Sequence, residues 1–128
     1  MIYLIDTNVI VRLVTGDIPD LHKKALKFFE NIEKGACKGI LTESVLAEAF
    51  YVLQSFYKME KEQIIDDLQV ILMNENILYE NKGEAFEAFA IVKRSNLSFV
   101  DALLCAKCKI NGYALMSFDK GLVKCVSH

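Results

Sequence analysis

Several residue types that define common functional sites are scarce in this chain of 128 residues. It has two histidines, His22 and His128, too few for a histidine-rich zinc site and a poor basis for a Ser–His–Asp triad. Isolated glycines such as Gly35 and Gly39 lack the lysine and hydroxyl residue of a phosphate-binding loop. A formal net charge of -2 argues against tight, sequence-independent binding of DNA or RNA through bulk charge.

Long apolar runs are also missing. No segment approaches the roughly 20 apolar residues that a membrane span needs. The apolar start at residues 2–5 is interrupted by Asp6 and has no basic region before it, unlike a signal peptide. We therefore expect a cytoplasmic protein without membrane association. In that compartment we expect the four cysteines, at positions 37, 105, 108 and 125, to be reduced thiols.

What the chain does have is a high apolar fraction, 53% of its residues, with a single proline. This composition and length predict one compact domain over residues 1–128. Short apolar runs alternate with segments of helical periodicity, and this alternation predicts an α/β fold with a mainly parallel sheet of four to five strands. The strands are expected at 2–5, 38–42, 77–79 and 113–117, with 123–126 as a candidate fifth, and the helices at 9–14, 21–32, 43–56, 58–72, 82–94 and 98–111.

Four carboxylates lie near the predicted strand ends and helix starts. Asp6 directly follows the first strand, and Asp119 lies two residues beyond the fourth. Sites in open α/β sheets lie outside the carboxyl ends of the strands. Glu48 and Asp101 each share a helical row with apolar residues, so both are expected to border a buried stripe.

Each carboxylate also has a purely structural explanation. Ser98-x-x-Asp101 can be a capping-box variant, Asp119 can be a helix N-cap, and Glu48 can be a rim residue with a solvated head. Asp6 is harder to explain this way, because it follows a strand expected to be buried. Taken together, four converging carboxylates repel one another unless a cation compensates them. All-oxygen ligands favour Mg²⁺ or Mn²⁺, and phosphodiester hydrolysis is the chemistry that follows.

The order and spacing of four motifs resemble those of the PIN-domain family over nearly the whole chain. The motifs are Ile-Asp-Thr-Asn at 5–8, Val-Leu-Ala-Glu at 45–48, Phe-Val-Asp-Ala-Leu at 99–103 and Ser-Phe-Asp-Lys at 117–120. The length and the stretch Thr-Glu-Ser-Val-Leu-Ala-Glu look like the VapC-type ribonuclease toxins of toxin–antitoxin pairs. The resemblance implies a three-layer α/β/α sandwich, Mg²⁺- or Mn²⁺-dependent RNA cleavage, a homodimer and inhibition by a cognate antitoxin.

The resemblance also implies roles for individual residues. The family's four acids fall on Asp6, Glu48, Asp101 and Asp119, which would be both catalytic residues and metal ligands. Its supporting polar residues fall on Asn8 and Ser117, which would orient ligands or water. Many relatives carry a further acid near the third, where this chain has Ser98, a departure that puts a second metal ion in doubt.

Three other features, an arginine, a pair of cysteines and an apolar tract, also lead to expectations. Arg12 lies one helical turn beyond Asn8 and can either reach a substrate phosphate or form a surface ion pair. Cys105-x-x-Cys108 falls inside a predicted helix without a second paired motif, so packing is its expected role. The apolar tract at 50–57 is first of all core, and it is also a candidate dimer or antitoxin surface.

Three functional hypotheses remain open. The first is a Mg²⁺- or Mn²⁺-dependent endoribonuclease. The second uses the same metal site as a structure-specific DNA nuclease or phosphohydrolase. The third is a non-catalytic module, either a PIN-type scaffold or a phospho-acceptor domain. A phospho-acceptor domain needs an aspartate after a central strand, whereas the third strand here leads into Glu80-Asn81.

Overall fold

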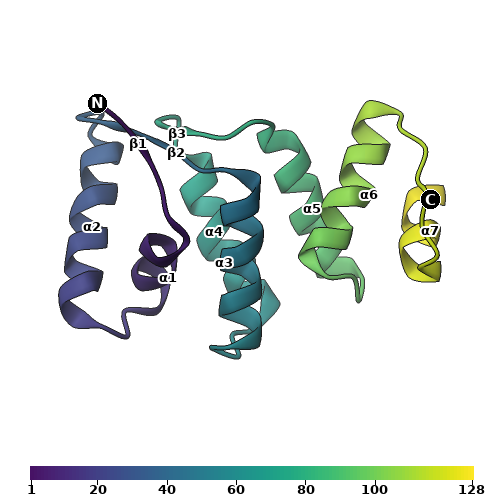
Figure 1. The fold of residues 1–128 in the computed structure, drawn as a ribbon, viewed down its shortest axis with the longest axis horizontal. Helices are drawn as coiled ribbons and strands as arrows, with labels where there is room; N and C mark the ends of the chain where they lie inside the picture. The colour runs from purple at the N-terminus through teal and green to yellow at the C-terminus, as the bar shows by residue number, and fades with distance from the viewer. The chain divides into compact units, whose positions relative to one another are not determined.

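A computed structural model describes residues 1–128, which form two compact units, Met1–Glu80 and Asn81–His128 (Figure 1). The single domain expected from the length and composition stays a prediction. The first unit contains every strand of the structure, together with four helices. The second unit is entirely helical. No helix in the chain is both long enough and apolar enough to cross a membrane.

A parallel sheet in the order β1-β2-β3 forms the first unit's framework, with β1 at Ile2–Leu4, β2 at Lys38–Ile40 and β3 at Ile77–Leu78. In its register Tyr3 lies opposite Gly39, which in turn lies opposite Ile77. A Cβ at Gly39 would lie 2.7 Å from Ile5 Cδ1 and 3.1 Å from Ile32 Cδ1. Glycine therefore lets the middle strand and its apolar neighbours approach closely.

The helices of this unit are α1 (Thr7–Thr15), α2 (Pro19–Glu33), α3 (Glu43–Ser55) and α4 (Lys61–Met73). In Figure 1 they lie below the strands. Residues at helical spacing supply the core, and the side chains of Ile10, Ile32, Leu46, Leu53 and Leu68 are all fully buried. Gly16 ends α1 in the left-handed conformation, with φ 62°, and its N–H donates to the carbonyl of Arg12.

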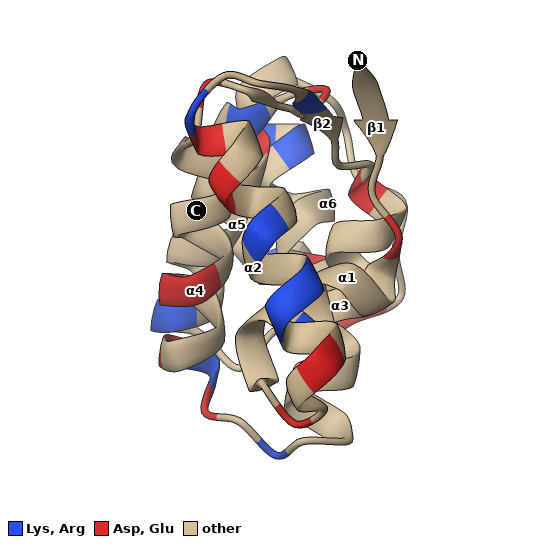
Figure 2. Cartoon of the chain, turned by 90° about the vertical axis from the view of Figure 1, so that its left-hand side faces the viewer, with Lys and Arg blue, Asp and Glu red and all other residues tan.

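Helix α2 carries charges of both signs on its exposed surface. Figure 2 shows blue segments in its middle and red segments towards its two ends. The basic segments are Lys23, Lys24 and Lys27, and the acidic ones include Asp20 and Glu30. This mixture fits a solvated helix face.

The second unit consists of α5 (Lys82–Arg94), α6 (Phe99–Asn111) and α7 (Lys120–Ser127). Phe89 of α5 and Phe99 of α6 stack with ring centroids 5.2 Å apart. Glu84 of α5 is 7% exposed, and its two carboxylate oxygens accept hydrogen bonds from Lys107 and Asn111 of α6, each at 2.8 Å. Apolar stacking and a charged network thus hold α5 and α6 together.

The strand count differs from the four to five predicted. Residues 113–117 form no strand, and 123–126 lie inside α7. A strand needs a hydrogen-bonded neighbour, and the second unit contains no strand with which residues 113–117 can pair. In the last segment Asp119 caps a helix whose Leu122, Cys125 and Val126 recur at helical spacing. The prediction of an α/β chain with a parallel sheet is confirmed.

The cysteines also differ from the expectation of four reduced thiols. Cys105 of α6 and Cys125 of α7 form a disulfide, with their Cα atoms 6.2 Å apart. Cys37 and Cys108 are free thiols, as expected. Spacing along the chain could not reveal the bridge, because its two cysteines are 20 residues apart and meet through the packing of α7 on α6.

The apolar tract at 50–57 is divided between core and surface. Phe50 and Leu53 are buried, whereas Tyr51 is 69% exposed and Phe56 is 75% exposed. Its core role is therefore confirmed for one face of α3, and its role as a partner surface stays a prediction for the other.

Candidate functional site

Asp6 is the N-cap of α1, directly after the sheet. Its Oδ1 accepts a hydrogen bond from the Thr7 backbone N–H at 2.9 Å, and its side chain is exposed. The strand before it is not buried as predicted: Leu4 is 72% exposed, and Ile5, just past the strand, is the buried residue. Asp6 therefore also has a structural role, while its Oδ2 makes no hydrogen bond.

Glu48 lies in α3, which Thr42 begins by accepting a hydrogen bond from the Val45 N–H at 3.3 Å. Its neighbours Leu46 and Ala49 are buried, whereas Glu48 itself is exposed and its carboxylate makes no hydrogen bond. Helix α3 packs against α1, the helix that Asp6 caps. Asp6 and Glu48 are thus carried by two neighbouring helices of the first unit.

Asp101 lies in the first turn of α6, where Ser98 is the N-cap. Ser98 Oγ accepts a hydrogen bond from the Asp101 backbone N–H at 3.2 Å. A complete capping box would also have the acid's side chain accept from the N-cap N–H. The half-buried Asp101 carboxylate makes no such bond, so capping does not account for it.

Asp119 is the N-cap of α7, and its Oδ1 accepts a hydrogen bond from the Leu122 N–H at 2.8 Å. Ser117 Oγ in turn accepts from the Asp119 N–H at 3.0 Å. Ser117 therefore fixes the backbone at Asp119, and Asp119 Oδ2 makes no hydrogen bond.

The four acids fall into two pairs, Asp6 with Glu48 in the first unit and Asp101 with Asp119 in the second. No group of three or more His, Cys, Asp or Glu side chains is placed to hold a metal ion. The convergence of all four acids therefore stays a prediction.

Asp101 and Asp119 line the same pocket, which has a volume of about 650 Å³ and lies wholly within the second unit. We call it the α6–α7 pocket. Ser98 and Asn96 add polar groups to its wall, and Lys109 and Lys124 add positive charge. It therefore combines carboxylates with positively charged side chains.

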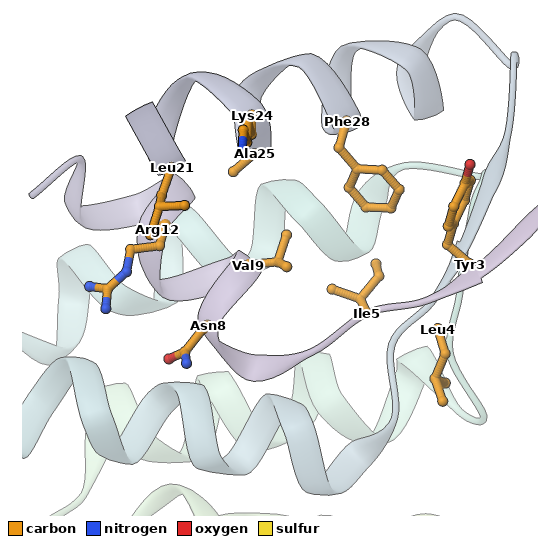
Figure 3. A pocket seen from close by; sticks show the side chains of 10 residues that line it. All are labelled: Tyr3, Leu4, Ile5, Asn8, Val9, Arg12, Leu21, Lys24, Ala25 and Phe28. Atoms are coloured by element: carbon orange, nitrogen blue, oxygen red, sulfur yellow. The ribbon is translucent and has the colours of Figure 1, made fainter. Parts of the chain in front are cut away.

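Asn8 and Arg12, the predicted supporting residues of the first unit, line a different pocket of about 390 Å³ (Figure 3). The rest of its wall is mostly apolar, and Tyr3 meets Phe28 edge-on with ring centroids 5.4 Å apart. In Figure 3 these rings lie at one end and Asn8 and Arg12 at the other. None of the four acids lines this apolar pocket.

Arg12 forms the ion pair that was one of its two predicted roles. Its guanidinium lies 2.9 Å from Asp17 Oδ2 and also donates to Tyr57 Oη at 2.9 Å. Tyr57 donates to Asp17 Oδ2 at 2.7 Å, and Thr15 donates to its Oδ1 at 2.8 Å. The bonds from Tyr57, Thr15 and Arg12 lower the pKa of Asp17 from 3.8 to about 2.

Sequence reasoning missed Lys109 and Lys124, and it missed Asp17 and Tyr57 as partners of Arg12. The lysines gave a weak signal, since each lies in the last turn of its helix, where a cation is ordinarily favoured by the helix dipole. The contact between Tyr57 and Asp17 gave none, because it joins residues 40 positions apart.

Comparison with known proteins identifies the family of the chain. The sequence matches the PIN domain over residues 3–125, and the chain belongs to that family, whose fold is a three-layer α/β/α sandwich. Among its relatives is the VapC ribonuclease of Aquifex aeolicus (strain VF5). The two are 29% identical over 122 residues, which cover 94% of this chain and 90% of the relative.

Proposed function

We propose that this protein is an endoribonuclease that uses Mg²⁺ or Mn²⁺ and acts as the toxin of a toxin–antitoxin pair. One observation carries the proposal: all four acids that match the PIN motifs are present, and each keeps at least one carboxylate oxygen free of hydrogen bonds. Membership of the PIN family and similarity to a VapC ribonuclease support it.

The donor set fits a hard divalent cation. Asp6 and Asp119 each use one oxygen as a helix cap and leave the other free, and the carboxylates of Glu48 and Asp101 are wholly free. Mg²⁺ and Mn²⁺ take oxygen ligands of this kind and retain water and phosphate oxygens as further ligands. Once bound by these acids, such an ion would supply an activated water and charge neutralisation for an in-line attack on phosphorus.

The protein's own residues hold and orient the reacting groups. The caps fix Asp6 and Asp119 at the starts of α1 and α7, because each side chain is tied to the first turn of its helix. Ser117 restrains the backbone at Asp119. Asn8, exposed on α1 two residues after Asp6, would orient a water or a ligand.

Cleavage of labelled RNA tests the proposal. Purified protein should cut RNA with Mg²⁺ or Mn²⁺, and both a chelator and Asp6→Asn should abolish the cut. Asp20→Asn is the matched control, because Asp20 is also an exposed aspartate near the start of a helix but belongs to no PIN motif. Cleavage that persists in chelator and in Asp6→Asn would refute the proposal.

The same assay separates the alternative functions. RNA, single-stranded DNA, flap DNA and a phosphomonoester should be offered side by side, and preferential cleavage of RNA is expected. Preference for flap DNA or the monoester would favour the other metal-dependent activities. Calorimetry without any binding of a divalent ion would favour a non-catalytic scaffold.

We further propose that the protein forms a homodimer, that it is cytoplasmic and that a cognate antitoxin binds it. Exposed Tyr51 of α3 and Phe56, the C-cap residue of α3, together with the apolar pocket, support the expectation of protein partners. A short reading frame for a DNA-binding protein immediately upstream of the gene would support the antitoxin, and light scattering would test the dimer.

A further inference from the structure

The α6–α7 pocket carries opposite charges at its two ends. Asp119 and Asp101 lie at the start of α7 and in the first turn of α6, whereas Lys124 and Lys109 lie in the last turns of the same helices. The two helices run in the same direction. A Cβ at Gly121 would lie 3.6 Å from Leu97, just before α6, and the disulfide joins later positions on both helices.

This parallel arrangement separates the lysines from the acids by a useful distance. At a rise of about 1.5 Å per residue, Lys124 lies about 7 Å beyond Asp119 along α7, and Lys109 lies about 12 Å beyond Asp101 along α6. Each lysine therefore lies further along the pocket than the acids. The distances suit contacts with neighbouring phosphates of the same strand.

The two lysines are also available to bind an anion. Both are exposed, and neither forms an ion pair or a side-chain hydrogen bond. Arg94 lines the same pocket, but it is paired with Glu87 at 3.2 Å. The helix dipole explains why one lysine suits the end of one helix, but it does not explain why two unpaired lysines from different helices line one pocket with two acids.

We propose that Lys109 and Lys124 form a subsite for the RNA phosphates next to the one at Asp101 and Asp119. This inference rests on the proposed ribonuclease function and adds a route for the substrate strand along the α6–α7 pocket. The phosphate backbone is the ligand, so the subsite contributes affinity without selecting a base. It would also give a protein of net negative charge a local positive charge for a polyanion, because two unpaired lysines line one pocket.

Fluorescence anisotropy with labelled single-stranded RNA, in chelator so that the strand stays intact, tests the subsite. Lys109→Ala/Lys124→Ala should weaken binding at least about 10-fold. It should also reduce the slope of log K against log salt concentration by about 1.4, because each lost phosphate contact on a single strand contributes about 0.7 to that slope. Lys109→Arg/Lys124→Arg should retain binding. Lys23→Ala/Lys27→Ala removes the same charge from exposed α2 and should leave binding unchanged.

The possible results test the lysine subsite and the proposed ribonuclease activity separately. Equal RNA binding and salt dependence in wild type and Lys109→Ala/Lys124→Ala would overturn the subsite, as would binding of an acidic peptide but no RNA. A melting temperature close to that of wild type shows that the variant is folded. If wild type binds RNA through these lysines but never cuts it when Mg²⁺ is added, the subsite stands and the ribonuclease proposal fails.

Discussion

Ser98 Oγ accepts a hydrogen bond from the backbone N–H of Asp101, and the Asp101 carboxylate makes no bond in return. The cap of α6 and the acid proposed as a metal ligand are therefore different side chains. Mutations at Ser98 and at Asp101 can therefore test the cap and the metal ligand separately.

Substitutions at the two positions should affect different properties. Asp101→Asn should weaken metal binding at least about 10-fold and abolish RNA cleavage while leaving the melting temperature nearly unchanged. Ser98→Ala should destabilise the protein by about 1 kcal/mol, because α6 loses its cap, and should retain metal binding. Thermal unfolding with Mn²⁺ titration checks both, and a large loss of stability in Asp101→Asn with normal Mn²⁺ affinity would assign Asp101 a structural role instead.

Asp119 should combine both roles. Asn is as good an N-cap as Asp, so Asp119→Asn should keep the stability of α7 and lose activity. Asp119→Ala should lose activity and about 1 kcal/mol of stability as well. Chemical denaturation of the two variants measures the difference, and identical stabilities would show that the bond to Leu122 does not stabilise the helix.

The buried Glu84 should make stability depend on pH. The hydrogen bonds from Lys107 and Asn111 lower the pKa of Glu84 below its ordinary value of 4.5. The folded state thus favours the charged form, and the resulting stabilisation is present above 4.5 and is lost as the pH falls through the lower folded pKa. Glu84→Gln should destabilise the protein by about 2 kcal/mol near neutral pH.

Melting curves from pH 7 to pH 3 check this network. The difference in melting temperature between wild type and Glu84→Gln should shrink as the pH falls. Glu75→Gln changes an exposed glutamate outside any ion pair and serves as the control. A difference that stays constant over the whole range would mean that the charge of Glu84 does not stabilise the fold.

The disulfide between Cys105 and Cys125 should tie α7 to α6. A small dithiol reductant that opens it should lower stability by about 3 kcal/mol, the loss expected for a loop of this length. Alkylation in denaturant, followed by mass spectrometry, should label two thiols, Cys37 and the otherwise buried Cys108, before reduction and four afterwards. Four labelled thiols in the untreated protein would contradict the bridge.

Much of the fold was predictable from the sequence because local periodicity determined it. Helices α2, α3, α5 and α6 begin and end close to their predicted bounds, since caps such as Thr42 and Ser98 and stops such as Gly112 are local signals. Contacts between distant residues were less accessible. Residues 113–117 look like a strand but have no partner strand in their unit, and Cys105 meets Cys125 only through the packing of two helices.

The candidate site was likewise predictable where local signals determined it and not where it depended on atomic positions or on contacts between helices. The four acids were identified from their positions after predicted strands and helix starts and from their resemblance to the PIN motifs. Only the atomic positions show that Ser98 is the cap and that the Asp101 carboxylate is free, because the sequence fits both a capping and a metal-binding role for Asp101. The sequence could not show that Lys109 and Lys124 line one pocket, because this depends on the parallel packing of α6 and α7.

Asp6, Glu48, Asp101 and Asp119 are each proposed as a ligand of the divalent ion. Calorimetric titration of Mn²⁺ into wild type, Asp6→Asn, Glu48→Gln, Asp101→Asn and Asp119→Asn tests this proposal most directly, with Asp20→Asn as the control. Wild type and the control should bind Mn²⁺ alike, and each of the other four substitutions should weaken binding at least about 10-fold. Unchanged affinity after both substitutions in either unit, or no binding by wild type, would contradict the proposal.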